Sequence, residues 1–490
     1  MQLNTNLIIN ILSKHGLLIK APQVEIQVES ISFHSKKLGH NCLFVCKGNN
    51  FKKEYLEAIH HQLSAYISEV DYEVDLPLIL VKDVLKAMAL LADALYDHPS
   101  QDLNLIGITG TKGKTSSLYF LKSILDAHSK KGDTAYLGSV EIYNGDHIVP
   151  SLLTTPESLT LQQIFRDVKE NGKENVIMEV SSQALKYDRV YGIEYHYGIF
   201  LNISNDHISD VEHPTFQDYI ESKLKLFDHS KVCIMNADLV DYLSDEQKKQ
   251  VYTFSLTQEA TIRAADIEMD THGSHFNILY KGEKYPIYLS VPGLFNIENV
   301  LSVILVALDM NIPVEAIQYG LAHTSVPGRM KQFNDEHHHV ASIVDYAHND
   351  ASFTQIFKYA QQFYPNYHIK AVFGCPGDKA FNRRHELGQA ANCFADEIYL
   401  VPDDSGHEDI EQINQQIAEV ITDKPYYSFD DREAGIQKAF MDIKEPTIVM
   451  VLGKGNETTQ KINGTTVPYD GDEEVVKASM RQFVSKQVSL

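Results

Sequence analysis

The sequence predicts an α/β protein, and three features of the chain indicate this class. Short runs of β-branched and aliphatic residues alternate with segments whose apolar residues recur at helical spacing. A glycine-rich loop joins one of the predicted strands to the helix that follows it. The chain has 490 residues, enough for about three domains that each bury a core. Such alternation is typical of a mostly parallel sheet with helices on both faces.

Composition and charge disfavour several classes of partner. The chain has 43 Lys and Arg against 66 Asp and Glu, a net charge of −23, which opposes binding to nucleic acid or to an anionic membrane. Its five cysteines are scattered and odd in number, so we expect neither a disulfide framework nor a zinc site. Because the N-terminal segment lacks an export signal, we expect a cytoplasmic location. We also expect a monomer and, from the net charge, no nucleic-acid or membrane partner.

Two turn signals divide the chain into three predicted domains. One helical pattern stops before Pro99, because a proline disfavours helical conformation in the residue that precedes it. Another ends at the turn sequence Val326-Pro327-Gly328. We therefore predict an N-terminal domain over residues 1–98, a central domain over 99–327 and a C-terminal domain over 328–490.

Strand patterns occur in each predicted domain. The N-terminal domain has two, ESISF (29–33) and NCLFVCKG (41–48), ahead of helical segments, and so looks like a small α/β cap. The central domain has LNLIGIT (103–109), TAYLGSV (134–140), NVIMEVS (175–181), YGIFLNIS (197–204) and KVCIMN (231–236). The C-terminal domain repeats the pattern with VASIVDYA (340–347), IKAVFG (369–374), EIYLVP (397–402) and TIVMVLG (447–453). Both larger domains are therefore predicted to contain parallel sheets.

The segment TGTKGKT (109–115) follows the first central strand and precedes a helix. Its glycines let successive backbone N–H groups face a phosphate, and the start of the helix adds partial positive charge. Lys114 can reach the terminal phosphates of a nucleotide, and Thr115 can bind Mg²⁺. A plain glycine-rich turn is the alternative, but the strand–loop–helix context favours nucleotide binding by Gly110, Thr111, Lys112, Gly113, Lys114 and Thr115.

Two further side chains are candidate metal ligands. Glu179 ends a predicted strand, where a carboxylate suits Mg²⁺, although it could also be a capping or loop residue. Lys223 lies on the apolar face of a helix predicted over 214–227, whereas Lys225 points away. A lysine in apolar surroundings has a lowered pKa, and its neutral amine can take up CO2 as a carbamate that binds a second Mg²⁺. Periodicity alone favours the alternative, in which Lys223 extends to solvent.

The motifs, in their order along all three predicted domains, resemble those of the Mur ligases. They are SISFHSKK (from 30), TGTKGKT, TTPES (154–158), MEVSSQALKYDRV (178–190), LFNIENV (294–300), VPGRM (326–330), DYAHN (345–349) and GKGNETTQ (453–460). The resemblance implies a UDP-binding N-terminal domain, a central ATP-binding P-loop domain and a Rossmann-like C-terminal domain that binds an amino acid. It also implies ATP-dependent amide formation, and it is strongest to the members that add the third residue of the peptidoglycan stem peptide. Their substrates are UDP-N-acetylmuramoyl-L-alanyl-D-glutamate and an amino acid.

The same resemblance implies roles for individual residues. Lys114, Glu179, Lys223 and His207 would form the catalytic group, with Thr115, Glu179, His207 and carbamylated Lys223 as Mg²⁺ ligands. Ser35 would contact the uridine, and the muramoyl dipeptide would meet Thr154, Thr155, Ser182 and Arg189. The adenine nucleotide would meet Asn296, Arg329, Asp345 and His348.

The choice of amino acid is predicted from the C-terminal domain. Members that use diaminopimelate resemble one another in a D-N-P-R motif, whose arginine binds a second carboxylate. Here the stretch reads Asp403-Asp404-Ser405-Gly406, and Glu457 could add a third negative charge. We therefore expect L-lysine, with its α-carboxylate at Lys379. Ornithine stays open because a methylene is worth only ~1–3 kcal/mol in a pocket. The rival functions are a folylpolyglutamate-synthetase-like ligase and a P-loop binding protein without ligase chemistry.

Overall fold

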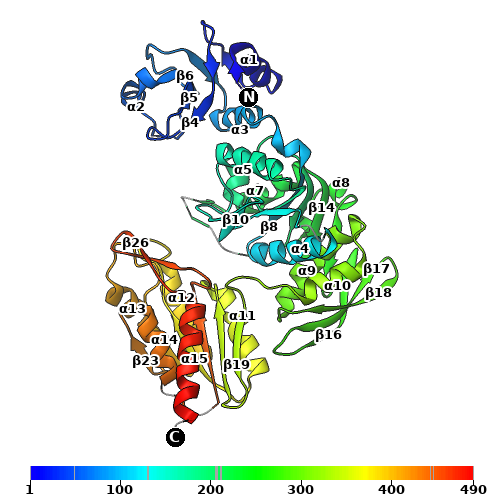
Figure 1. Cartoon of the computed structure of the whole chain (residues 1–490), viewed down its shortest axis with the longest axis vertical. Coiled ribbons are helices and arrows are strands. Elements are labelled where there is room, and N and C mark those ends of the chain that lie inside the picture. The colour runs from blue at the N-terminus through cyan, green and yellow to red at the C-terminus, as the bar shows by residue number, and fades with distance from the viewer. Residues whose placement is uncertain are drawn as a thin grey trace. The chain divides into compact units, whose positions relative to one another are not determined.

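The computed structural model describes residues 2–48, 50–129, 132–204, 208–209, 212–441, 443–444 and 446–488. Figure 1 shows the order of helices and strands along the chain. The chain forms two compact units. The first contains Met1–Ile267, His275–Leu289 and Leu294–Thr324, and the second contains Glu268–Ser274, Ser290–Gly293 and Ser325–Leu490. The division into three domains stays a prediction.

The first hundred residues contain a five-stranded sheet in the order β2-β7-β6-β5-β4. Its strands are β2 (Leu18–Lys20), β4 (Ser30–Ser32), β5 (Cys42–Val45), β6 (Leu63–Ser68) and β7 (Leu78–Val81). The short helix α2 (Lys53–Glu57) connects β5 to β6, and a further strand pair joins β1 (Leu3–Asn4) to β3 (Gln27–Val28). The predicted strands ESISF and NCLFVCKG correspond to β4 and β5.

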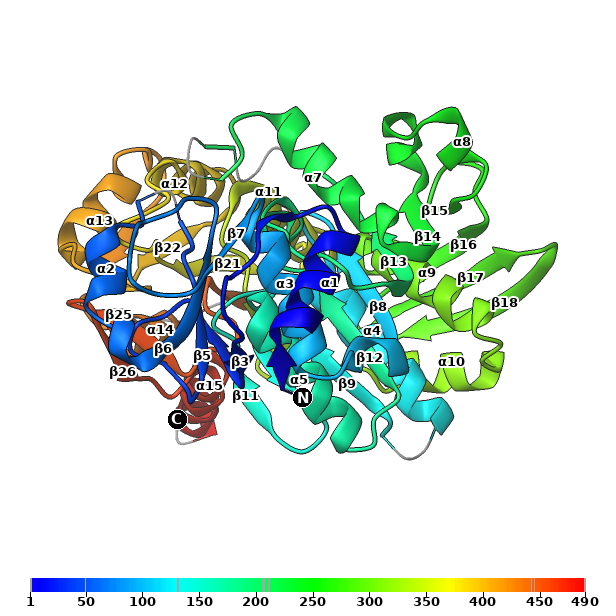
Figure 2. The ribbon, with the colours of Figure 1, turned by 90° about the horizontal axis from the view of Figure 1, so that it is seen from above.

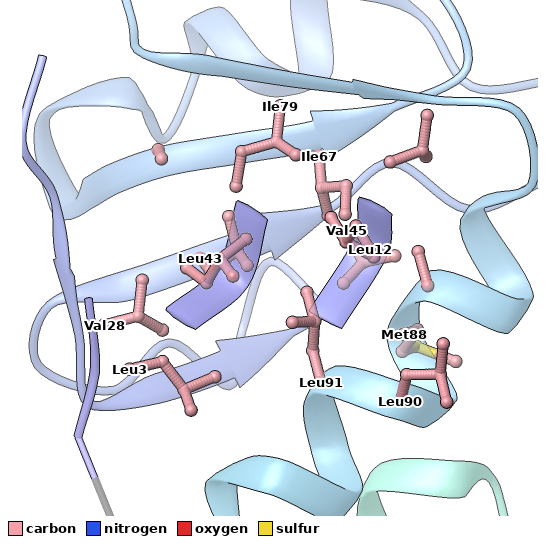
Figure 3. Close-up of a cluster of buried hydrophobic side chains, with 14 of the residues drawn as sticks. Leu3, Leu12, Val28, Leu43, Val45, Ile67, Ile79, Met88, Leu90 and Leu91 are labelled. Carbon is pink, nitrogen blue, oxygen red and sulfur yellow. The ribbon is translucent and has the colours of Figure 1, made fainter. Parts of the chain in front are cut away.

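Helices α1 (Thr5–Lys14) and α3 (Val84–Leu95) contact one another and cover this small sheet, as Figure 2 shows from above. Each begins at a capping side chain: Asn4 accepts a hydrogen bond from Leu7 N, and Asp83 accepts from Leu85 N and Lys86 N. Their apolar faces meet the strands in one buried cluster, drawn in Figure 3. It includes Leu12 from α1, Leu43 and Val45 from β5, Ile67 from β6, Ile79 from β7, and Met88 and Leu91 from α3.

The rest of the first unit is built on an 11-stranded sheet in the order β11-β10-β9-β12-β8-β13-β14-β15-β16-β17-β18. Its centre consists of the five predicted strands, which pair in parallel: β8 (Asn104–Thr109), β9 (Thr134–Leu137), β12 (Asn175–Glu179), β13 (Tyr195–Phe200) and β14 (Ser230–Asn236). The prediction of an α/β fold with a mostly parallel central sheet is therefore confirmed.

The strands that extend this sheet were not singled out from the sequence. On one side β10 (Glu141–Tyr143) and β11 (Ile148–Pro150) are antiparallel. On the other are β15 (Tyr252–Ser255), β16 (Ile262–Met269), β17 (Ser274–Tyr280) and β18 (Glu283–Leu289), of which β15 and β16 continue the parallel pairing.

Helices cover both faces of the central strands. Because side chains alternate along a strand, Leu105, Val176 and Met178 share one face, where they pack against α5 (Ser158–Glu170) and Leu226 of α7 (Phe216–Asp228). Ile106 and Ile177 point to the opposite face and are equally buried. There α4 (Lys114–Ser129) contacts β8, β9 and β12, and it packs against α9 (Leu294–Asp309) and α10 (Val314–Ala322). The remaining helices are α6 (Ser182–Lys186) and α8 (Asp245–Lys248).

The second unit has a six-stranded sheet in the order β19-β20-β24-β21-β22-β23. Its strands are β19 (Lys331–Asp335), β20 (Val340–Asp345), β21 (His368–Phe373), β22 (Glu397–Leu400), β23 (Tyr426–Ser428) and β24 (Thr447–Leu452). Among the described strands of this sheet, β19 alone pairs antiparallel. The helices of this unit are α11 (Asp350–Phe363), α12 (Asn382–Phe394), α13 (Ile410–Ala418), α14 (Arg432–Met441) and α15 (Asp472–Val488). The unit also contains a hairpin of β25 (Thr459–Ile462) and β26 (Thr465–Pro468). The four strands predicted here are confirmed.

None of the helices in the described part of the chain combines the length and the apolar character that crossing a bilayer requires.

Candidate active site

The phosphate loop occupies the turn between β8 and α4. The Nζ atom of Lys114 folds back over it and donates to the carbonyl oxygens of Gly110, at 2.9 Å, and Thr111, at 3.3 Å. Asn202, just after β13, holds the loop from the other side: its Oδ1 accepts from Lys112 N at 2.9 Å and its Nδ2 donates to Lys112 O at 3.0 Å. The loop is therefore curled and braced as phosphate binding requires.

Helix α9 meets the loop at Gly113. This residue has φ +85°, and a Cβ atom placed on it would lie 2.4 Å from Oδ1 of Asn299. Glycine is therefore required both by the backbone conformation and by the close approach of α9. Asn296, predicted for the adenine side, is buried one turn earlier on the same helix. The sequence analysis missed Asn299, although it lies within the quoted segment LFNIENV.

Glu179 lies fully buried at the end of β12, beside the phosphate loop. Its Oε1 accepts hydrogen bonds from the hydroxyl of Thr115, at 2.8 Å, and from Ser139 N, at 2.9 Å. Its Oε2 accepts from the Ser139 hydroxyl at 2.8 Å. Octahedral Mg²⁺, with ligands at about 2.1 Å, puts neighbouring oxygens about 3 Å apart, so the Thr115 and Glu179 oxygens suit one ion. Ser139 was not predicted, although it lies within the strand pattern TAYLGSV.

Lys223 also reaches the phosphate loop. Its side chain, on α7, is only 2% exposed, and Nζ donates to the carbonyl oxygen of Gly110 at 2.9 Å. The same Nζ lies 4.6 Å from the ring centre of Tyr219, whose hydroxyl bonds that of Thr111 at 3.1 Å. Lys225 is exposed. The alternative in which Lys223 extends to solvent is therefore wrong. A carbamate retains one N–H, so the Gly110 hydrogen bond is compatible with a carbamylated side chain.

The helix that carries Lys223 begins at Phe216, two residues later than predicted, because Thr215 caps it by accepting from Asp218 N. His207, the other predicted metal ligand of this region, lies outside the described residues.

Three of the residues predicted to bind the dipeptide gather beside Glu179. The buried Thr155 hydroxyl donates to Glu179 O and accepts from Ser181 N, each at 2.9 Å. The Thr154 hydroxyl lies 3.2 Å from that of Ser139. The neighbouring Ser182 is buried at the start of α6. Thr155 therefore fixes the short segment that carries both Glu179 and Ser182.

Arg189, three residues after the end of α6, contacts the segment that carries Thr155. One of its terminal nitrogens donates to Thr155 O at 3.2 Å, and its Nε lies 3.2 Å from Glu157. Glu157 in turn pairs with Lys47 at 2.5 Å, which links the segment after β5 to the central sheet. Ser35, predicted for the uridine, lies in an exposed turn after β4.

The second unit groups the other residues predicted for the nucleotide. Asp345 ends β20 and accepts a hydrogen bond from Met330 N at 2.7 Å, while the Arg329 guanidinium lies 3.9 Å away. Burial raises the pKa of the Asp345 carboxyl, and Arg329 opposes that shift. Arg329 also lies over the Tyr346 ring at 4.9 Å, and Nδ1 of His348 is 2.8 Å from Tyr346 O. Three residues predicted from two separate motifs, VPGRM and DYAHN, therefore lie close together.

The predicted acidic group also forms, but with a cation that the sequence analysis missed. Lys454 is fully buried, and its Nζ lies 2.6 Å from Glu457 Oε2, 3.0 Å from Asp404 Oδ1 and 3.5 Å from Asp403 Oδ1. Burial alone would lower the pKa of Lys454, but the nearby carboxylates raise it. The three predicted carboxylates are therefore partly neutralised by a buried ammonium of the same chain. Lys454 is part of the quoted motif GKGNETTQ, so its position was visible but its contacts were not.

Lys379 lies in an exposed turn after β21. That turn is tied to the loop after β22, because Gly377 N donates to Asp404 O at 2.8 Å. A Cβ atom on Gly377 would lie 1.8 Å from Ser405 O, so only glycine permits this contact. Because β21 and β22 are parallel neighbours, the predicted α-carboxylate cation and the acidic group lie on adjacent loops.

A P-loop sheet with a buried carboxylate hydrogen-bonded to the threonine that ends the phosphate loop, followed by a second, mostly parallel α/β sheet, is typical of a nucleotide-dependent ligase. Residues 108–307 match the Mur ligase middle domain and residues 328–455 match the Mur ligase glutamate ligase domain. The chain belongs to the Mur ligase family.

Similar proteins cover almost the whole chain. It is 37% identical to the UDP-N-acetylmuramoyl-L-alanyl-D-glutamate--L-lysine ligase of Enterococcus faecalis, over 94% of this chain and 92% of that protein. It is 36% identical to the UDP-N-acetylmuramyl-tripeptide synthetase of Lactobacillus delbrueckii subsp. bulgaricus, over 99% of this chain and 100% of that protein. Among solved structures, a UDP-N-acetylmuramoyl-L-alanyl-D-glutamate--2,6-diaminopimelate ligase matches with a TM-score of 0.67 and 26% identity, covering 96% of this chain and 98% of that one.

Proposed function

We propose that this chain is the ATP-dependent ligase that joins L-lysine to UDP-N-acetylmuramoyl-L-alanyl-D-glutamate in peptidoglycan precursor synthesis. The observation that carries the proposal is the pair of Thr115 and Glu179 at the phosphate loop, with Lys223 buried against the same loop. The name of the similar Enterococcus faecalis ligase supports both substrates. We also propose that the enzyme acts as a monomer in the cytoplasm, where ATP is present.

The reaction needs an activated carboxylate, because an amine does not displace oxygen from a free carboxylate in water. The γ-carboxylate of the D-glutamyl residue attacks the γ-phosphorus of ATP, so that ADP leaves and an acyl phosphate forms. The α-amine of lysine then attacks the acyl carbon, the bond from carbon to the phosphate oxygen breaks, and phosphate leaves while the amine gives up a proton. Lys114 and the backbone N–H groups of the loop stabilise the negative charge on the transferring phosphoryl group.

The residues at the loop fit Mg²⁺, which would neutralise phosphate charge when bound. Thr115 and Glu179 would hold one ion through oxygen atoms already 2.8 Å apart. Carbamylated Lys223 would supply an anionic oxygen ligand for a second ion, with His207 as a further ligand. Ser139 acts on this site by orienting Glu179, since it donates to both carboxylate oxygens.

The substrate-binding residues of this proposal come from segments before and after Glu179 in the sequence and from the second unit. Thr154, Thr155, Ser182 and Arg189 would bind the dipeptide, and Ser35 the uridine. Asn296, Arg329, Asp345 and His348 would serve the adenine nucleotide, with Arg329 supplying a cation held over the Tyr346 ring.

The charge balance of the acidic group supports lysine as the amino acid. The carboxylates of Asp403, Asp404 and Glu457 surround the single ammonium of Lys454. Three negative charges against one positive charge leave this acidic group with an excess of negative charge. An incoming side chain that ends in an ammonium compensates this excess, whereas one that ends in a carboxylate adds to it. Lys379, on the adjacent loop, would bind the α-carboxylate. Ornithine is the alternative, one methylene shorter.

A product assay tests the proposal. The purified chain is incubated with ATP, Mg²⁺ and UDP-N-acetylmuramoyl-L-alanyl-D-glutamate, and with lysine, ornithine or diaminopimelate, and products are identified by mass. We expect one lysine to be added per molecule of ATP consumed. Folate with glutamate serves as the rival substrate pair. Product with that pair, or no lysine product, would overturn the proposal.

A further inference from the structure

Three side chains outside the metal site form a chain of hydrogen bonds from Ser182 into the protein. The Ser182 hydroxyl lies 2.9 Å from Nε2 of His213, and Nδ1 of His213 lies 2.5 Å from Oδ2 of Asp218. His213 is fully buried and Ser182 is 6% exposed. The order serine, histidine, carboxylate is the arrangement in which a carboxylate sets the tautomer of an imidazole.

The chain of hydrogen bonds crosses from one helix to the next. Ser182 is the first residue of α6, His213 precedes α7, and Asp218 lies in the first turn of α7. Lys186, at the end of α6, donates to the same Asp218 oxygen at 2.8 Å and to Glu212 O at 3.0 Å. The Tyr219 ring packs on His213 with centres 5.0 Å apart. All three groups therefore have fixed positions.

The donors and acceptors along the chain can be assigned in order. Burial raises the pKa of Asp218, but hydrogen bonds from Lys186 and His213 lower it by more, so the net shift is downward. The carboxylate is therefore ionised and can only accept hydrogen bonds. Nδ1 of His213 must therefore carry a proton. Burial lowers the pKa of His213, which favours the neutral ring with a bare Nε2. The Ser182 hydroxyl must then donate its proton to Nε2, and its oxygen has only lone pairs left for any other partner.

We propose that His213 and Asp218 hold the Ser182 hydroxyl as a hydrogen-bond acceptor, so that Ser182 binds the amide N–H between alanine and D-glutamate rather than a carboxylate or phosphate of the substrate. This assignment rests on the proposed function and names the part of the substrate that Ser182 binds. Ser182 follows Glu179 by three residues in a segment held by the Thr155 hydroxyl. With Glu179 beside the transferring phosphate, as the proposed function has it, Ser182 would face the glutamyl end of the dipeptide. Carboxylates and phosphates only accept hydrogen bonds, and that amide supplies the nearest N–H of the dipeptide. His213 is a positioning residue.

A substrate analogue tests the assignment. Replacing D-glutamate by D-2-hydroxyglutarate turns the amide into an ester and removes the N–H. We expect the wild type to prefer the amide substrate by about 10-fold, mainly in KM, the size expected for one lost hydrogen bond. Ser182→Ala and His213→Phe should lose this preference, and His385→Gln, which alters an exposed histidine 3.0 Å from Glu419, should keep it. An equal preference in wild type and Ser182→Ala would overturn the assignment.

A second measurement does not depend on turnover, and its decisive reading uses the wild type alone. With ¹⁵N-labelled histidine, the His213 ring in the wild type is expected to give the neutral signature with the proton on Nδ1, and Ser182→Ala should shift its Nε2 resonance. A proton on Nε2 at neutral pH would overturn the inference even if the ligase activity is confirmed. Loss of lysine addition by the wild type would instead overturn the proposed function and leave this signature unaffected.

Discussion

The hydroxyl of Thr115 donates a 2.8 Å hydrogen bond to the buried carboxylate of Glu179, 64 residues further along the chain. The two side chains meet because β8 and β12 are parallel neighbours, with Glu179 in register with Ile108. Both strands end at the same edge of the sheet, so the phosphate loop that follows β8 lies beside the end of β12. This pairing brings together two residues that were predicted separately as Mg²⁺ ligands.

Lys114→Ala is expected to lower kcat by roughly 1,000-fold, because its ammonium stabilises the phosphoryl group in transfer. The fold should survive, since Nζ bonds carbonyl oxygens of the phosphate loop itself, at Gly110 and Thr111. Lys122→Ala, on the same helix, is the matched control. Steady-state kinetics and circular dichroism check both variants. Wild-type turnover in Lys114→Ala would remove the phosphate-loop assignment.

Lys223→Ala is expected to be nearly inactive and to regain part of its activity when short carboxylates such as formate or acetate are added. The added anion would replace the carbamate as a ligand for Mg²⁺. Lys225→Ala, two residues along α7 and exposed, should behave as the wild type with or without the anion. Activity is measured in buffers depleted of CO2 and replete with it. Full activity of Lys223→Ala in depleted buffer would refute the role.

Asp404→Asn is expected to lower kcat/KM for lysine by about 10-fold, because it removes one charged acceptor from the acidic group. The wild type should strongly prefer lysine to diaminopimelate, and the variant should narrow that preference. An arginine at Gly406 is a poor test, since Gly406 has φ +60° and an added Cβ would lie 2.2 Å from Asp378 Oδ2. Competition assays with the two amino acids check the prediction. Efficient use of diaminopimelate by the wild type would overturn the specificity argument alone.

Lys454→Met is expected to lower the free energy of unfolding by about 3–5 kcal/mol, because it leaves three carboxylates without their buried cation. The pKa of Lys454 is raised above its ordinary 10.5, so its contribution is fully present below that value and is lost only as pH rises through the higher folded-state pKa. The difference between wild type and variant should therefore be the same at pH 7 and pH 9. Urea unfolding measures it. A difference that vanishes by pH 9 contradicts the assignment.

Gly113→Ala is expected to abolish tight ATP binding. The substitution forces an L residue to φ +85° and places its Cβ 2.4 Å from Asn299. Gly172→Ala is the matched control, because Gly172 has φ +67° and nothing lies within 4 Å of the added Cβ. The Gly172→Ala variant therefore has only the strain of an L residue at positive φ, roughly 1–2 kcal/mol, and no steric clash. Calorimetric titration with ATP compares the two variants, and equal affinity would show that the contact with α9 does not matter.

The sequence by itself determined the parts of this protein that depend on neighbours along the chain. The strand patterns predicted the centres of both large sheets, and the spacing of TGTKGKT predicted the phosphate loop. Helical periodicity placed Lys223 on the buried face of α7, although it could not tell whether the long side chain turned back to solvent. The resemblance of ordered motifs then indicated the family.

The tertiary structure alone decided which side chains meet across distant segments. Asn202 braces a loop 90 residues earlier, Ser139 orients Glu179, and Lys454 neutralises Asp404 from 50 residues away. Periodicity reports which face of an element is buried, but a hydrogen bond depends on the order and register of strands that the local pattern does not encode. Polar contacts of this kind are short and directional, so they become visible only when the sheet has brought both partners to one edge.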